Sequence, residues 1–136
     1  VPGAGAAGGL GAALLALGAE LHSGVETVLD LIGFDERVRD VDLVITGEGN
    51  MDDQSAAGKA PVGVARRAKR YSKPVVAVVG GRADNLDAVY EQGVDLVLTI
   101  CRKPMGLELA LDPQEAITNL ICAGESAARS YDLARL

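Results

Sequence analysis

The side chains best suited to chemistry gather in one polar stretch between positions 46 and 61. They are those of Glu48, Asp52, Asp53, Gln54, Ser55 and Lys59. Carboxylates and an amide with a lysine beside them suit an anionic or phosphorylated ligand held together with Mg²⁺. Glycines on both sides of Glu48 predict a sharply turned backbone that displays this carboxylate. A solvated surface loop without function is the alternative interpretation of the same residues.

Gly58 and Lys59 do not belong to a Walker A phosphate loop. That motif would place glycine at position 53 and serine or threonine at position 60. The chain has Asp53 and Ala60 at these positions. Lys59 is therefore expected to act as a single cation at the start of a helix.

A second candidate site is the glycine-rich segment at positions 3–9, which includes Gly5, Gly8 and Gly9. Its spacing matches the dinucleotide pattern G-x-G-x-x-G, although the two residues before it are too few to show the strand that this pattern follows. Small residues at the start of a helix expose N–H groups that favour an anion. Tight packing against a neighbouring element explains the same glycines equally well. A nucleotide-binding dehydrogenase remains a weaker alternative on this pattern.

Two further patterns predict structure rather than chemistry. Ser23 and Glu26 have the spacing of a capping box at the start of a helix. A basic run on a later helix is predicted to be a solvated face, because the apolar stripe of that helix lies elsewhere. The run consists of Arg66, Arg67, Lys69 and Arg70.

The elements that must position these side chains alternate along the chain. Apolar runs predict strands at 42–46, 74–79 and 94–100. Helices are expected at 10–21, 23–32, 61–71, 85–92 and 113–133, with one more turn within 34–41. Alternating strands and helices predict a three-layer α/β/α fold with a mostly parallel sheet, Rossmann-like or flavodoxin-like. Ligands of such folds bind at the carboxyl ends of the strands, where the polar stretch begins.

Composition limits the classes of function. The chain has 136 residues, which predicts a single α/β domain over 1–136. A net charge of −6 argues against a nucleic-acid partner, and no apolar run is long enough for a membrane span. Two cysteines give neither a disulfide framework nor a soft-metal site, so a cytoplasmic location is expected. The missing initiator methionine suggests a piece of a longer protein, and homodimerisation is left open.

Two stretches of the sequence resemble signatures of the bacterial glycerate kinase family. The first runs from Gly3 to Leu14. The second runs from Asp42 through Gly49 and continues with Asp52, Gln54, Ser55, Gly58, Lys59, Pro61, Gly63 and Ala65. The likeness extends from residue 2 to about residue 100. It departs from the family pattern at Asn50, where a basic residue is common, so no phosphate contact is expected from position 50.

The resemblance implies a two-domain kinase that uses ATP and Mg²⁺ to phosphorylate D-glycerate, in this branch at the 2-hydroxyl. Members are roughly three times longer than this chain. The chain would then be a C-terminal portion that supplies one side of the active-site cleft and is inactive alone. The resemblance assigns catalytic roles to Asp52, Lys59 and Glu48, and it makes Asp52 and Glu48 the expected Mg²⁺ ligands. Contacts to substrate or nucleotide fall to Gly5, Gly8, Gly9, Gly47, Gly49, Gln54, Ser55 and Gly58. A non-catalytic nucleotide- or anion-binding domain is the alternative.

Overall fold

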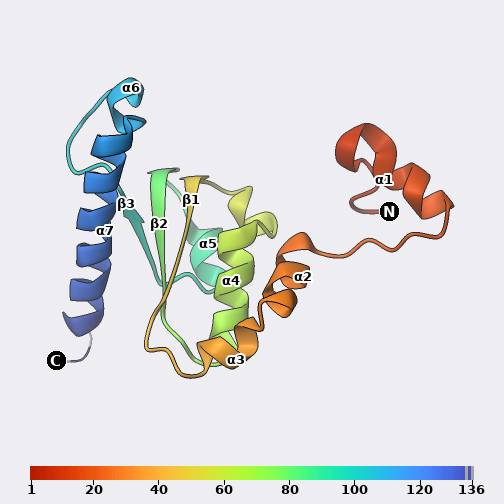
Figure 1. The fold of residues 1–136 in the computed structure, drawn as a ribbon, viewed down its shortest axis with the longest axis horizontal. Coiled ribbons are helices and arrows are strands. Elements are labelled where there is room, and N and C mark those ends of the chain that lie inside the picture. The colour runs from red at the N-terminus through yellow and green to blue at the C-terminus, as the bar shows by residue number, and fades with distance from the viewer. Residues whose placement is uncertain (134, 136) are drawn as a thin grey trace.

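A three-stranded parallel sheet forms the centre of the molecule (Figure 1). The computed structural model describes residues 1–133 and 135. The strands are β1 (Val44–Met51), β2 (Val75–Arg82) and β3 (Leu96–Thr99), in the spatial order β1-β2-β3. Val76 is paired with Ile45 on one side and with Leu96 on the other. The sequence-based expectation of a parallel sheet is confirmed.

Helices cover both faces of this sheet. The crossover helices α4 (Ala60–Lys69) and α5 (Asp87–Glu91) lie on one face, and α7 (Pro113–Leu133) lies on the other (Figure 1). The α4/α5 face buries the core, because alternate residues of β2 pack there against the apolar stripe of α4. These residues are Val75, Ala77 and Val79 from the strand and Val62, Ala65 and Ala68 from the helix. The three-layer architecture is therefore confirmed.

Three helices precede the sheet, namely α1 (Ala6–Ala16), α2 (Gly24–Leu31) and α3 (Phe34–Val38). The helix expected at 10–21 is wrong at its end, because Gly18 adopts a left-handed conformation with φ 89°. The N–H of Gly18 donates to Leu15 and that of Ala19 donates to Leu14, which is the Schellman stop. An extended segment follows, and α1 stands apart from the sheet (Figure 1).

The first strand is longer than its apolar run predicts. β1 continues through the polar residues to Met51, and Gly47 and Glu48 pair with Val78 and Val79 of β2. The turned backbone expected around Glu48 is therefore wrong, since this segment is extended. Glycine at position 47 serves strand packing, because a Cβ there would overlap the carbonyl oxygen of Val78.

The short elements η1 (Ser55–Ala57) and α6 (Leu107–Ala110) were not predicted. The long closing helix α7 was predicted with both of its ends. Its cap is also confirmed, because Asp112 Oδ1 accepts hydrogen bonds from the N–H groups of Gln114 and Glu115 at 3.0 Å each.

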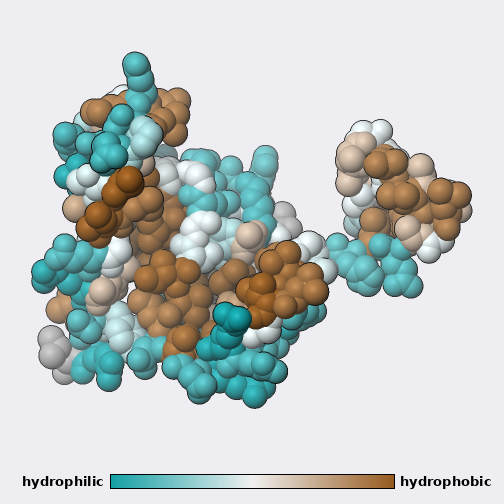
Figure 2. Space-filling model, viewed as in Figure 1, coloured by the Kyte–Doolittle hydropathy of each residue, from teal (hydrophilic) through white to brown (hydrophobic). Residues whose placement is uncertain are grey.

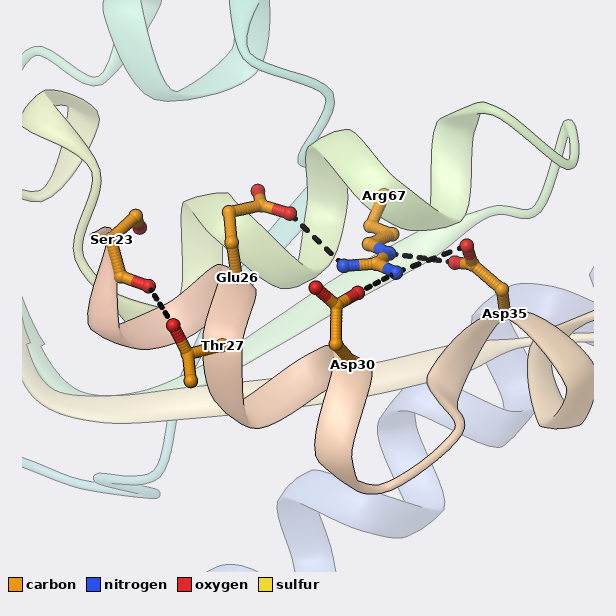
Figure 3. Close-up of polar contacts among 6 residues, drawn as sticks. All are labelled: Ser23, Glu26, Thr27, Asp30, Asp35 and Arg67. Atoms are coloured by element: carbon orange, nitrogen blue, oxygen red, sulfur yellow. Dashed lines mark hydrogen bonds and ion pairs between the residues drawn. The ribbon is translucent and has the colours of Figure 1, made fainter. Parts of the chain in front are cut away.

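Arg67 joins α4 to α2 and α3 (Figure 3). Its side chain is only 9% exposed, and its guanidinium donates to Asp35 at 2.7 Å, to Glu26 at 3.1 Å and also to Asp30. The solvated basic face is therefore wrong for Arg67. The capping box is wrong as well, because Glu26 binds Arg67 and Ser23 makes no side-chain cap.

Many hydrophobic side chains remain on the surface. Figure 2 shows them over the sheet between α7 and α2. Ile45 of β1 is 54% exposed, and Ile121 of α7 is 65% exposed. No helix among the described residues has both the length and the apolar character that crossing a bilayer requires.

Ser72 provides a local test of the backbone geometry after α4. It has φ 56°, in the left-handed region, where it ends α4 with a bond from Lys73 N–H to Ala68 O. Glycine adopts this conformation without the Cβ penalty, so Ser72→Gly should stabilise the protein by about 0.5–1 kcal/mol. Urea denaturation measures the change. Ser126→Gly, inside α7, should have the opposite sign, and a loss of stability in both variants would contradict this geometry.

Candidate functional site

Asp52 organises the loop that leaves the carboxyl end of β1. Its Oδ1 atom accepts hydrogen bonds from the N–H groups of Gln54 at 3.0 Å and Ser55 at 3.2 Å. The Ser55 hydroxyl, which is fully buried, accepts in return from the N–H of Asp52 at 3.1 Å. Aspartate and serine favour such turns because their short side chains satisfy nearby backbone groups. The loop is therefore fixed by its own sequence.

Lys59 faces this carboxylate from the start of α4. Its Nζ lies 3.5 Å from Asp52 Oδ1, and both side chains remain partly open to solvent. Partial burial raises the pKa of Asp52, but the Lys59 charge and the bonds from Ser55 and Gln54 outweigh it. The net result is a pKa of Asp52 below its usual value. The site thus holds an ionised carboxylate beside an accessible cation.

The charge of Lys59 can be tested through the titration of its partner. Lys59→Met should raise the pKa of Asp52, since a lowering cause is removed. Carbon-13 NMR of labelled aspartate measures the midpoint, and Lys73→Met serves as the control. A lowered pKa in the folded state stabilises the protein above the ordinary pKa of aspartate, and this stability is lost as the pH falls through the lowered value. An unchanged midpoint in Lys59→Met would show that the pair does not interact.

Glu48 offers an unsatisfied oxygen near the same strand end. Its Oε1 atom is buried and has no hydrogen-bond partner in the described part of the chain. The described residues contain no cluster of three metal-binding side chains. Mg²⁺ normally needs only one or two carboxylates, because waters and phosphate oxygens complete its shell. The orphaned oxygen of Glu48 is the kind of donor that such an ion takes.

The structure brings together only part of the predicted site. The loop unites Asp52, Gln54, Ser55 and Lys59, with Gly58 in a left-handed turn of φ 105° before Lys59. Gly47 and Gly49 lie in β1, next to this loop.

The glycine-rich segment lies elsewhere. Gly8 and Gly9 belong to α1 and Gly5 is its N-cap residue, and this helix stands apart from the loop (Figure 1). Gly8 and Gly9 have φ 67° and 96°, so the helix does not begin regularly there. The N–H of Gly9 already donates to Gly5 O at 3.3 Å. The anion site at this glycine-rich segment stays a prediction, and the segment does not lie beside the loop around Asp52.

The sequence did not predict a cavity that lies at the carboxyl ends of all three strands. Its volume is 510 Å³, and it lies on the α7 face. Its lining consists of Glu48, Gly49, Asn50, Val78, Gly80, Gly81, Ile100, Cys101, Leu107, Ala110, Leu111, Ala116 and Leu120. The strand ends were a usable signal for its floor, but nothing in the sequence placed α6 over it.

Arg102 fixes the segment that leads from β3 to this cavity wall. Its guanidinium donates to Asn119 Oδ1 and to Glu115 Oε1, both at 2.7 Å. Asn119 is fully buried in α7 and also contacts the sulfur of Met105. The loop after β3 is thereby tied to α7, although no sequence motif indicated these residues.

Comparison with known proteins gives a consistent result. The family model described as the glycerate kinase family matches residues 1–132. A glycerate kinase of Bacillus cereus is 52% identical over 111 residues, covering 81% of this chain and 29% of the relative. A glycerate 2-kinase of Escherichia coli is 52% identical over 101 residues, covering 74% of this chain and 26% of the relative.

A solved structure agrees in both fold and sequence. It is a crystal structure provisionally described as glycerate kinase 2 from Salmonella typhimurium LT2, with a TM-score of 0.67 and 39% identity. The match covers 98% of this chain and 34% of that chain. The chain thus spans less than a third of the length of the curated relatives named above. On these matches, the chain belongs to the glycerate kinase family.

Proposed function

We propose that this chain supplies one side of the active-site cleft of an enzyme that transfers the terminal phosphoryl group of ATP to D-glycerate. The observation that carries the proposal is the loop after β1, where an ionised Asp52 lies 3.5 Å from Lys59 at the carboxyl edge of a parallel sheet. Ligands of such sheets bind at this edge. The names of the relatives supply the substrate.

The two charged residues have complementary roles. Asp52 is ionised at neutral pH and accepts the proton of the attacking hydroxyl group. Lys59 neutralises the negative charge of the donor phosphate or of the glycerate carboxylate. Ser55, buried beneath the turn, holds Asp52 in place through the backbone. Phosphoryl transfer depends mainly on such positioning and charge neutralisation.

Glu48 and Asp52 are the residues that would hold Mg²⁺. The ion, when bound, supplies positive charge to the phosphate oxygens. The name of the Escherichia coli relative supports the 2-hydroxyl as acceptor, which makes 2-phosphoglycerate the product.

The decisive assay uses a family-length protein that contains this chain. ATP and D-glycerate should give ADP and 2-phosphoglycerate, which phosphorus-31 NMR distinguishes from the 3-phospho isomer. Formation of the 3-phospho isomer would overturn the regiochemistry alone. Binding of ATP without any transfer would support the non-catalytic alternative instead.

A further inference from the structure

We propose that the 510 Å³ cavity between the strand ends and α6 binds the nucleoside part of the phosphoryl donor. This inference rests on the proposed function and adds the location of one half of the donor. The cavity touches the carboxyl ends of β1, β2 and β3, where ligands of parallel sheets collect. Its volume lies within the ordinary range for small-molecule sites.

The lining favours a nucleoside over glycerate. Most of the walls are aliphatic, with Val78 and Ile100 from the sheet, Leu107 and Leu111 around α6, and Leu120 from α7. Burying the carboxylate of glycerate among such side chains would cost free energy, because the lining offers this anion no cationic side chain. The planar face of a nucleobase is apolar and gains contact with these aliphatic side chains.

Gly49 is the residue whose identity this proposal explains. It lies in β1 on the cavity lining, and a Cβ at this position would meet no atom within 4 Å. Gly47 and Gly80, in contrast, are required by the neighbouring strand, since a Cβ at Gly80 would lie 2.5 Å from Gly49 O. Glycine inside a strand without a packing reason is typical of a place where a ligand approaches the backbone.

The cavity is also continuous with the charged loop. Asn50 lines it, and Asn50 Nδ2 lies 3.5 Å from Asp52 Oδ2. A nucleoside seated against Gly49 therefore directs its phosphates along Asn50 toward Asp52 and Lys59. The apolar nucleoside thus lies in the aliphatic cavity, and the charged phosphates lie beside the polar loop at the same edge of the sheet.

The first test fills the cavity from its floor. In a family-length protein that contains this chain, Gly49→Val should raise KM for ATP about tenfold while kcat and KM for glycerate change less than about twofold. Gly49→Ala should give an intermediate value. Gly124→Ala is the matched control, since a Cβ there also meets open space and the residue lies outside the cavity lining. A rise in KM for glycerate with KM for ATP unchanged would overturn the proposal.

The second test needs no turnover. Cys101 is exposed on the cavity lining, so its alkylation by iodoacetamide reports occupancy. Mass spectrometry in a Cys122→Ser background should show that ATP and adenosine slow the alkylation at least about fivefold. Glycerate and inorganic tripolyphosphate should not slow it. Protection by tripolyphosphate equal to that by ATP would overturn the proposal, because phosphates alone would then account for it.

The two proposals fail in different ways. If adenosine protects Cys101 but glycerate is not phosphorylated, the proposed function is contradicted and the nucleoside site is still supported. Phosphorylation of glycerate by ATP without any protection of Cys101 would support the function and refute the location.

Discussion

Replacing Asp52 by asparagine in a family-length protein that contains this chain should lower kcat by about a hundredfold or more. Asparagine keeps an oxygen that can accept the N–H groups of Gln54 and Ser55, so the turn survives. The substitution removes the charge, which the proposed mechanism uses to take up the hydroxyl proton. Steady-state kinetics with saturating ATP and glycerate measure the loss.

Asp53→Asn is the matched control for this prediction. Asp53 is adjacent and exposed, so its variant should retain kcat within about twofold, as expected for a surface substitution. Unfolding temperatures of both variants should match the parent, which separates a chemical defect from a structural one. Turnover at the parental rate in Asp52→Asn would remove Asp52 from the mechanism.

The largest effect on stability is expected at Arg67. Arg67→Ala should lower the unfolding temperature by about 10 °C, because three carboxylates on α2 and α3 lose their shared cation (Figure 3). The hydrogen bond from Arg67 lowers the pKa of Asp35, so this contribution is present above the ordinary pKa of aspartate and fades in acid. Thermal unfolding followed by circular dichroism at pH 7 measures the change.

The neighbouring residue on α4 provides the comparison. Arg66 is exposed and bonds only to Gln92 among the described side chains. Arg66→Ala should therefore shift the unfolding temperature by at most about 2 °C. Equal effects of the two variants would mean that the network around Arg67 does not hold α2 and α3 in place. Arg67→Lys should recover little, because an ammonium cannot reach three carboxylates as the planar guanidinium does.

The apolar patterns predicted most of the architecture. Continuous runs of valine and leucine predicted β2 and β3, and the cap at Asp112 predicted the start of α7. These elements follow from local properties of the chain, namely burial on two faces and satisfaction of terminal N–H groups. The family resemblance led to the proposed function, which periodicity alone could not supply.

The errors arose where distant residues decide local structure. β1 extends through Gly47 and Glu48 because β2 pairs with them, and a polar composition does not reveal a partner strand. Arg67 is buried because α2 and α3 bring carboxylates to it from more than thirty residues away. No pattern within α4 distinguishes Arg67 from Arg66. Tertiary contacts override local propensity at these positions.

In the candidate site, too, the sequence predicted what neighbouring residues form and not what distant residues form. The loop around Asp52 was predicted because its turn is made by neighbours in sequence. The cavity depends on the approach of α6 to the strand ends, which only the folded chain specifies. Its glycine floor at Gly49 was part of the predicted site, whereas its aliphatic walls were not.

The open edge of β1 has a consequence for folding kinetics. β1 pairs with β2 in parallel across a crossover that contains η1 and α4, and such non-local pairing forms slowly. Until this pairing is complete, β1 with its exposed Ile45 presents an unpaired strand edge, which is a template for aggregation. Expression at low temperature or with chaperones should therefore improve the yield of correctly assembled protein.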